Sequence, residues 1–546
     1  MRKLMFVVAS LIILPIFCVG QLKFEETLLI ADNDYLYSQD IDSGNCRYIA
    51  TGYREVYNRS ISKDIVLVKW KDTPGYVWVK HYSGPSNRHD IGRHVMKTLD
   101  GGYLVSGTTN SYSTGVHYDA FAMKLNSSGT VQWFNYWGGS YTDLAYSSCE
   151  DNNYYYIAGC YTVSSTSTNT NGFICCFNKS NGALVWGKRY KNYNNSYYLN
   201  FTSIIVGYDN YLYVTGTANS TTTNNALCIK INPANGNVSW SYRYSVAGKN
   251  ITGINISKGQ NSGYMISGYS NSSSLYKVWL LKLRGNGTVS WSKIYYRSAT
   301  NDNGIQTKKT STGYAVYGVT KSFGSDDMFL MTTDTSGNNN SVHYYTGSSK
   351  TEGSLSFRDV GTALLELGNK GYAMVSGQKN ASNVWDLFLL RADQNGHTGC
   401  ELDTTFLDST LTVNRYILYD SLFNVTVYDS TITKYDITPS WDTICPPDSI
   451  DTLSSKSMLL NAPEIQKQDI LIYPNPVNDI LYVDFGGMVI EDAEIAIYDY
   501  MGRLVLKQKS QNKSIVPIAV SNLNKGVYFV QVRSGETQNC KKIVVD

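Results

Sequence analysis

The segment Tyr103-Leu-Val-Ser-Gly107 decides the fold, because seven versions of it occur along the chain. Each version is an apolar, aromatic run that ends in glycine, and successive closing glycines lie 50 to 59 residues apart: Gly52, Gly107, Gly159, Gly216, Gly268, Gly318 and Gly377. Alternating apolar residues predict β-strands that bury one face. A repeat of this length is typical of propellers, solenoids or arrays.

A second marker repeats with the first. A strand with a central tryptophan follows in each of the first five units, with similar spacing: Trp78, Trp133, Trp186, Trp240 and Trp291. With one strand before the Tyr-to-Gly strand and one after it, each unit contains four short antiparallel strands. This pattern predicts an all-β fold, a seven-bladed β-propeller over residues 21–399, with a solenoid as the alternative.

The two ends of the repeat region complement each other. The seventh unit runs from Gly396 to Cys400 without a fourth strand, and the N-terminal segment around Phe24 is similar to the tryptophan strands. We therefore expect the N-terminal strand to complete the last blade, which leaves no open sheet edge. The repeat resembles the Gly-Tyr and Trp propeller repeats of exported Bacteroidota proteins.

The charge balance says little about partners. The 47 Lys and Arg residues nearly offset the 44 Asp and Glu residues, which gives a net charge of +3. So small a charge does not draw a protein to nucleic acid or to an acidic membrane surface, and we expect no nucleic-acid partner. The apolar fraction of 42% is enough for a large core, which excludes a fully disordered chain.

Residues 1–20 are predicted to be a secretory signal peptide. Arg2 and Lys3 precede an apolar run, and we expect cleavage after Gly20, with lipidation of Cys18 as the alternative. No later run is long and apolar enough to span a bilayer, so we expect no transmembrane segment in the mature chain. Nine cysteines remain after Cys18, and we expect most of them to be single buried thiols.

The last 80 residues carry a different signature. Alternating apolar residues and turns predict a small β-sandwich (Ig-like) domain over residues 466–546. Its motifs lie around Tyr473, Pro474, Asn475, Pro476, Gly502, Gly526, Tyr528, Lys541 and Lys542. They resemble the type A C-terminal sorting domain of the type IX secretion system of Bacteroidota. An Ig-like binding module is the alternative.

The resemblance implies partners and a destination. It implies that the type IX secretion machinery recognises this domain at the outer membrane and that a sortase-like protease commonly removes it. The protein is then secreted or attached to the outer cell surface.

Residues 400–465 are rich in Asp, Ser and Thr and are predicted to be a linker. Seven Asp-Ser/Thr triplets in it resemble Bacteroidota O-glycosylation acceptors, whereas composition bias alone is the alternative: Thr404, Ser409, Ser421, Ser430, Thr443, Ser449 and Thr452. Cys400 and Cys445 bracket much of the segment and are candidates for a disulfide.

Common catalytic fingerprints for hydrolases, metalloproteases and dinucleotide enzymes do not occur in the sequence. Arg93 and His94 belong to a small cluster with His89 and Asp90 that could face a central channel. A hydrogen-bonded structural role is the alternative for this cluster.

One polar position recurs in every unit, 16 to 18 residues before the closing glycine: Asp34, Asp90, Asp143, Asn200, Asn250, Asp302 and Asp359. Oxygen ligands of this kind could form a ring that binds Ca²⁺ or sugar hydroxyls. The alternative is that each residue caps its own turn by accepting backbone N–H bonds. Calcium is therefore a candidate, and the sequence firmly implies no cofactor.

Two classes of function follow. The sequence favours a secreted or cell-surface binding or adhesion module for a glycan or a protein, without enzymatic activity. The alternative is an enzyme with its site in the channel, either a quinoprotein-like oxidoreductase or a glycan-active enzyme.

Overall fold

The computed structural model describes residues 24–445 and 471–545, apart from 30–33, 44–46, 57–61, 72–75, 86–87, 113–116, 163–169, 192–197, 220–222, 272–274, 298–300, 322–326, 346–362, 368–370, 380–384, 399–401, 405–406, 411–413, 418–421, 425–427, 431–432, 438–439, 474–475, 485–492, 500–502, 511–513 and 535–536. The predicted signal peptide lies outside these residues. Every regular element described is a β-strand, so the predicted all-β class is confirmed. Contacts divide the chain into two units, residues 1–450 and 451–546.

The first unit contains seven antiparallel sheets of five strands each, which we number 1 to 7. In sheets 1 to 6, four strands consecutive in the chain pair in order. Sheets 1 to 3 contain β2 (Asp34–Ser43), β3 (Arg47–Val56), β4 (Ser62–Lys71) and β5 (Tyr76–Ser83); β6 (Asp90–Lys97), β7 (Tyr103–Thr109), β8 (Asp119–Leu125) and β9 (Val131–Trp137); and β10 (Asp143–Glu150), β11 (Tyr154–Thr162), β12 (Thr170–Asn178) and β13 (Leu184–Tyr190).

Sheets 4 to 6 repeat the same order. They contain β14 (Leu199–Val206), β15 (Leu212–Asn219), β16 (Asn224–Ile231) and β17 (Val238–Ser245); β18 (Asn250–Lys258), β19 (Tyr264–Asn271), β20 (Tyr276–Leu283) and β21 (Val289–Tyr296); and β22 (Asp302–Lys309), β23 (Gly313–Thr320), β24 (Asp327–Asp334) and β25 (Asn339–Tyr345).

Sheet 7 is assembled from both ends of the repeat region. It contains β26 (Leu364–Glu366), β27 (Tyr372–Lys379) and β28 (Trp385–Ala392), and β1 (Phe24–Leu29) then pairs antiparallel with β28. Phe24 lies opposite Arg391 in this register. The prediction that the N-terminal strand completes the last sheet is confirmed.

A fifth strand on every sheet comes from the segment for which the sequence predicts a linker. These strands, which we call the belt, follow the sheets in reverse order from sheet 6 to sheet 1 and end on sheet 7: β29 (Leu402–Thr404), β30 (Leu407–Thr410), β31 (Asn414–Ile417), β32 (Leu422–Asn424), β33 (Tyr428–Ser430), β34 (Thr433–Ile437) and β35 (Ser440–Cys445). The fourth strand of each sheet would otherwise present unpaired backbone groups, and the Thr, Ile and Tyr residues of the segment favour extended structure.

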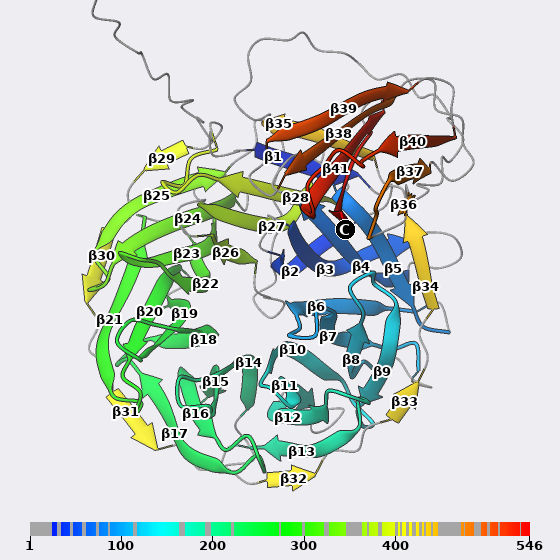
Figure 1. Ribbon diagram of the computed structural model, residues 1–546. Helices are drawn as coiled ribbons and strands as arrows, with labels where there is room; N and C mark the ends of the chain where they lie inside the picture. Colours follow the sequence, from blue (N-terminus) through cyan, green and yellow to red (C-terminus); the bar gives the residue numbers. More distant parts are fainter. Residues whose placement is uncertain are drawn as a thin grey trace, which may run out of the picture. The chain divides into compact units, whose positions relative to one another are not determined.

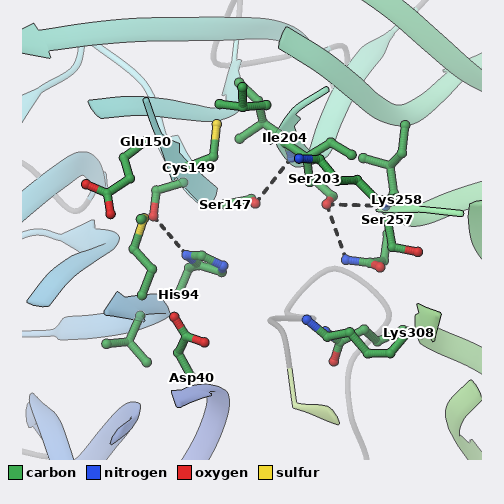
Figure 2. Close-up of a pocket in the computed structure, with 18 of the residues that line it drawn as sticks. Asp40, His94, Ser147, Cys149, Glu150, Ser203, Ile204, Ser257, Lys258 and Lys308 are labelled. Carbon is green, nitrogen blue, oxygen red and sulfur yellow. Dashed lines mark hydrogen bonds between the residues drawn. The ribbon is translucent and has the colours of Figure 1, made fainter. Parts of the chain in front are cut away.

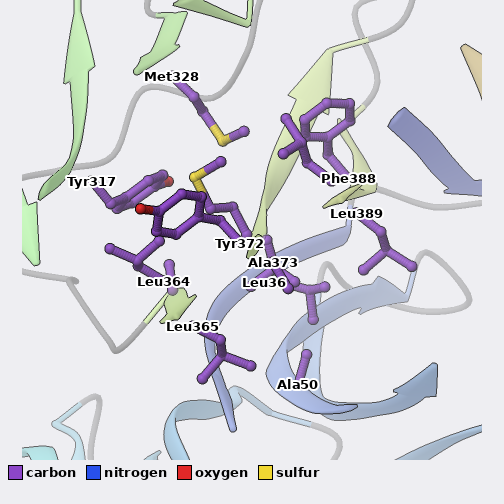
Figure 3. Packing of buried hydrophobic residues seen from close by; sticks show 14 of the residues in the cluster. Leu36, Ala50, Tyr317, Met328, Leu364, Leu365, Tyr372, Ala373, Phe388 and Leu389 are labelled. Atoms are coloured by element: carbon purple, nitrogen blue, oxygen red, sulfur yellow. The ribbon is translucent and has the colours of Figure 1, made fainter. Parts of the chain in front are cut away.

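The seven sheets follow one another around a common centre, with β2, β6, β10, β14, β18, β22 and β26 nearest to it (Figure 1). We call these the inner strands. Sheet 7 contacts sheet 1 through β27 and β2, and the Gln39 side-chain amide donates hydrogen bonds to the carbonyl oxygens of Ala363 and Ala373 at 2.7 and 2.8 Å. Buried residues of sheets 6, 7 and 1, including Met328, Phe388 and Leu36, form one apolar cluster there (Figure 3).

The repeat glycines lie where a side chain does not fit. In sheets 1 to 6 each pairs with an inner-strand residue just before a β-bulge. A Cβ on six of these glycines would lie only 1.7 to 2.2 Å from a carbonyl oxygen of that strand: Gly52, Gly107, Gly159, Gly216, Gly268 and Gly318. Only glycine allows the two strands to approach this closely.

The tryptophans connect neighbouring sheets. Trp133, Trp186 and Trp291 each lie against a positive-φ turn glycine of the next sheet, for example Gly236, where an added Cβ would meet the Trp186 ring at 2.7 Å. Four residues after Trp186, the Tyr190 hydroxyl donates a hydrogen bond to the Gly236 carbonyl at 2.7 Å. The same tyrosine bond recurs between other neighbouring sheets, from Tyr82, Tyr244, Tyr295 and Tyr345.

The second unit has two antiparallel sheets. One contains β36 (Leu471–Tyr473), β37 (Ile480–Asp484) and β40 (Ile515–Ala519), and the other β39 (Leu504–Ser510), β38 (Ala493–Asp499), β41 (Gly526–Ser534) and β42 (Thr537–Val545). Buried residues of both sheets, such as Val483 and Ile497, share one core.

We predict that Gly216→Ala lowers the free energy of unfolding by at least about 2 kcal/mol, because the new methyl group overlaps a backbone carbonyl that cannot rotate away. Chemical denaturation of the purified protein measures this change. Gly139→Ala is the matched control, because a Cβ at Gly139 would meet no atom within 4 Å. The free energy of unfolding of this variant should stay within about 0.5 kcal/mol of wild type. Equal effects of the two substitutions would contradict this explanation of the repeat glycine.

Candidate functional site at the centre of the sheets

Inner strands of sheets 1 to 6 line a cavity of about 520 Å³, within the size range of small-molecule sites. The lining comes mainly from the second half of each strand. Its polar members are Gln39, Asp40, His94, Ser147, Ser148, Cys149, Glu150, Ser203, Asn255, Ser257, Lys258, Gln306, Lys308 and Lys309.

In sheets 2 to 6 the first residue after the β-bulge is polar and lines this cavity, and in sheet 1 it is Ser38, directly before the lining residues Gln39 and Asp40. The first residue after each bulge is Ser38, His94, Ser147, Ser203, Asn255 or Gln306. A bulge bends a strand and redirects the side chains that follow it. The glycine that permits the bulge therefore also sets the direction of the polar residue.

Most of these polar residues bind a neighbouring sheet. The Ser147 hydroxyl accepts a hydrogen bond from the Ile204 N–H at 3.2 Å, and the Ser203 hydroxyl accepts one from the Ile256 N–H at 3.3 Å. The Gln306 side-chain oxygen accepts one from Leu364 of sheet 7 at 2.6 Å. The same side chains thus join the sheets and form the cavity wall (Figure 2).

His94 is the one imidazole in the lining. It is buried, and its Nδ1 lies 2.8 Å from the Ser148 hydroxyl oxygen. Burial and the positive charge of Lys308 lower the pKa of His94 to about 3. The imidazole is therefore neutral at pH 7 and is only a weak base.

The two carboxylates of the lining already accept hydrogen bonds from the protein. Asp40 accepts the backbone N–H groups of Ile41 and Lys97, each at 2.8 Å. Burial raises the pKa of Asp40, and these bonds oppose the rise. Glu150 accepts the Leu99 N–H at 2.8 Å and pairs with Lys179.

Other polar groups of the wall are less well satisfied. The side-chain oxygens of Asn255 and Ser257 have no hydrogen-bond partner in the described part of the chain, although Asn255 is only 7% exposed. Asp40, His94 and Lys308 lie around the same open space (Figure 2). Unsatisfied buried oxygens and an ammonium group of this kind can bind a polar ligand.

Arg93 is next to this cavity but is not part of its lining. It is the bulged residue of β6, is buried, and stacks its guanidinium over the rings of Tyr37 and Tyr146 at 5.9 and 5.5 Å from their centroids. Of the predicted Arg93 and His94 cluster, only His94 lines the cavity.

The six recurring Asp and Asn residues that the structure describes lie at or next to the first residue of their inner strands, and none of these six lines the cavity. Asp90 accepts hydrogen bonds from the Gly84 N–H at 2.8 Å and from the hydroxyls of Thr109 and Ser111. Burial raises its pKa. The contacts of Asp90 match the turn-capping alternative.

Four other members of this set also accept hydrogen bonds, two from the segment just before their own strand and two from the neighbouring sheet. Asp143 accepts the Gly139 N–H at 2.8 Å, Asp302 accepts the Arg297 N–H at 3.0 Å, and Asn250 accepts the Asn224 N–H at 2.8 Å. Asn200 accepts the Thr170 hydroxyl, Asp34 is buried, and Asp359 lies outside the described residues.

A calcium site finds no support in these contacts. In the ranges that the structure describes, no group of three or more His, Cys, Asp or Glu side chains could hold a metal ion.

The described cysteine side chains are free thiols: Cys149, Cys160, Cys175, Cys176 and Cys228. All but Cys149 are buried, which confirms the expectation of single buried thiols for these four. Cys400 and the Cys445 side chain lie outside the described parts, so the proposed disulfide stays a prediction.

The predicted O-glycosylation acceptors also remain predictions. Thr404, Ser409, Ser430 and Thr443 lie in belt strands, whereas Ser421, Ser449 and Thr452 are outside the described residues.

Part of the predicted sorting signal is described. Tyr473 ends β36 and is 41% exposed, Pro476 is exposed, and Gly526 begins β41. The buried Tyr528 donates its hydroxyl to the Asn524 carbonyl at 2.8 Å. The backbones of Lys541 and Lys542 pair with Val530 and Phe529, while Pro474, Asn475 and Gly502 lie outside the described residues.

Most residues of the cavity wall were not predicted from the sequence, including Asp40, Asn255, Ser257 and Lys308. A signal for part of it does exist: three to five residues after each recurring Asp or Asn, the first six units all have Ser, His, Asn or Gln. Lysines and carboxylates do not recur at one position, so the repeat alone does not identify them.

The comparison with protein families matches residues 471–546 to the secretion system C-terminal sorting domain. No curated protein matches the chain. Among the solved structures that match is the extracellular domain of a protein described as a hybrid two-component system from B. thetaiotaomicron, at 8% identity over 93% of this chain and 77% of that chain, with a TM-score of 0.17. A TM-score this low supports no inference about fold or function.

The sorting domain indicates export by type IX secretion, so the protein is secreted or attached to the cell surface. Among the described residues, no helix has the length and apolar character to cross a bilayer.

We predict that His94 lowers the free energy of unfolding of the protein as the pH falls from 7 to 5. The folded protein keeps this imidazole neutral down to about pH 3, whereas the unfolded chain binds a proton below about pH 6.5. Proton binding therefore favours the unfolded state between about pH 3 and pH 6.5. The contribution of His94 to the free energy of unfolding should fall by on the order of 2 kcal/mol between pH 7 and pH 5.

Chemical denaturation at pH 7 and pH 5 measures this effect against His94→Gln, which cannot titrate. Burial raises the pKa of Asp119 to about 6 and of Asp143 to about 7, so these carboxyls act with the opposite sign in the same window. Only the difference between wild type and the variant isolates His94. Identical pH slopes for the two proteins would refute the prediction.

Proposed function

We propose that the protein is an exported, non-enzymatic binding module: a seven-bladed β-propeller whose central cavity takes a glycan or another polar ligand. The seven sheets would be the blades, and residues 1–20 the signal peptide. The observation that carries the proposal is the cavity itself, with polar side chains from six inner strands and buried oxygens of Asn255 and Ser257 without partners in the described chain.

The C-terminal unit supplies the export signal in this proposal. We take it to be an Ig-like, type A sorting domain that the secretion machinery recognises and a sortase-like protease removes. Its match to the sorting-domain family and its two sheets around one core support this view.

An enzyme in the cavity is the second candidate, because His94 and Ser148 form a hydrogen-bonded pair as a base and a nucleophile would. The pKa of His94 argues against it. A general base works best when its pKa is near the working pH, and a pKa of about 3 gives little driving force for taking a hydroxyl proton at pH 7. A role in binding therefore fits His94 and Ser148 better than a role in catalysis.

We predict that the purified mature protein binds glycans on an array and that Ser257→Tyr abolishes this binding by filling the cavity. Ser257 lies in β18 and lines the cavity. Ser239→Tyr is the control, since Ser239 is an exposed residue of β17. Glycan binding that survives Ser257→Tyr would move the binding surface to the loops, and turnover of a bound glycan would favour the enzyme.

We also predict that a chain without residues 470–546 stays in the periplasm of a host with type IX secretion, because it lacks the signal that the outer-membrane machinery recognises. Cell fractionation and immunoblotting measure its location. The reciprocal control joins residues 466–546 to a periplasmic reporter, which should then leave the cell. Normal export of the truncated chain would overturn the assignment.

A further inference from the structure

The cavity wall has more lysines than carboxylates, and its carboxylates already have hydrogen-bond partners in the protein. Three lysines line the cavity, Lys258, Lys308 and Lys309, against two carboxylates, Asp40 and Glu150. Because His94 is neutral at pH 7, the lining has one excess positive charge. Both carboxylates already accept protein N–H groups.

Lys308 is the ammonium group that stands out. Its side chain is half-buried and makes no hydrogen bond or ion pair with any residue that the structure describes. Asp40 and Glu366 are near enough to favour its charged form, although burial still lowers the pKa of Lys308. An ammonium group that is partly withdrawn from water without a direct partner loses hydration free energy, and an anion placed beside it offsets that loss.

The same wall offers groups that recognise hydroxyls. The Asn255 amide nitrogen donates to the Ser203 hydroxyl at 3.3 Å, which leaves its side-chain oxygen as a free acceptor in the described chain. The Ser257 hydroxyl, two residues further along β18, also has no partner there. A carbonyl acceptor and a hydroxyl can together bind a vicinal diol, whereas an apolar ligand would leave both groups unpaired.

We propose that the ligand is a sugar acid, a hydroxylated ring with a carboxylate, which binds its carboxylate at Lys308 and its hydroxyls at Asn255 and Ser257. This inference rests on the proposed function, because it names the ligand class of the same cavity. A bare anion would use Lys308 alone, and a neutral sugar would use Asn255 and Ser257 alone. Only a molecule with both a carboxylate and hydroxyl groups pairs with Lys308, Asn255 and Ser257 together.

Isothermal titration calorimetry of the mature protein tests this with D-galacturonate, D-galactose and sulfate. The first two differ only in the carboxylate, and sulfate carries charge without the sugar hydroxyls. We expect D-galacturonate to bind at least about tenfold more tightly than either of the others, as one lost charge-assisted hydrogen bond implies. Equal binding of galactose would overturn the role of Lys308, and equal binding of sulfate would overturn the role of the hydroxyl-recognising groups.

Two variants assign the contacts. Lys308→Met should weaken galacturonate binding at least about tenfold and leave galactose binding unchanged, because it removes the charge-assisted bond alone. Asn255→Asp, which is nearly isosteric, should weaken galacturonate more than galactose through repulsion of the ligand carboxylate. Lys71→Met is the control, since Lys71 is exposed at the end of β4 and does not line the cavity.

The outcomes separate the two proposals. If galactose and galacturonate bind equally and Ser257→Tyr blocks both, the cavity is a binding site and only the sugar-acid assignment fails. If no sugar binds the wild type by calorimetry or on the glycan array, the sugar-acid assignment and the assignment of the cavity to glycans both fail. Melting temperatures of the variants close to wild type exclude misfolding as the cause of lost binding.

Discussion

The absence of a side chain at the repeat glycines is the constraint on which the rest of the first unit depends. At Gly216, for example, a methyl group would overlap the Asn200 carbonyl oxygen at 1.8 Å. Without that group the second strand can lie close to the inner strand at the point where the inner strand bulges. The bulge then turns Ser203 toward the next sheet and the centre. Strand pairing, sheet-to-sheet bonding and the cavity wall therefore have one local origin, repeated along the chain.

Closure of the unit depends on segments far apart in the sequence. Sheet 7 joins residues 364–392 to β1 near the N-terminus and to β35 at the end of the belt, and β1 lies between β28 and β35. Bringing such distant segments together costs chain entropy, which grows only slowly with loop length. The backbone bonds on both sides of β1 and the apolar cluster shared by sheets 6, 7 and 1 offset that cost. The belt adds a strand to every sheet and leaves the outer edge of the fourth strands covered.

Much of the fold could be predicted from the sequence because its cause is local and recurs. Gly107, Trp133 and their counterparts mark strands and turns whose requirements are the same in every unit, and the similarity of Phe24 to the tryptophan strands was enough to predict the pairing of β1. The belt could not be predicted as strands in the same way. Its strands are three to six residues long and are stabilised by the sheet edges that they meet, whereas their own composition resembles that of a polar linker.

The candidate site was predictable only in part, for a related reason. Asp90 and Asp143 recur visibly, but recurrence reflects a need that every sheet shares, and their contacts cap turns. The polar groups of the cavity wall differ from sheet to sheet: Asp40 comes from sheet 1, Asn255 from sheet 5 and Lys308 from sheet 6. A repeat alignment averages out these differences between the sheets.

The cavity wall therefore contains two kinds of polar group with different energetic roles. Ser147, Ser203 and Gln306 accept backbone N–H bonds across sheet boundaries, so their loss would weaken the fold whether or not a ligand is present. Lys308 and the Asn255 side-chain oxygen take part in no such bond in the described chain. Burial of a polar group without a partner is unfavourable, and a ligand that paired with these groups in the folded state alone would offset that free energy. The bonds between the sheets do not need Lys308 or the Asn255 side-chain oxygen. The proposed binding function would explain why these two polar groups lie in the cavity wall.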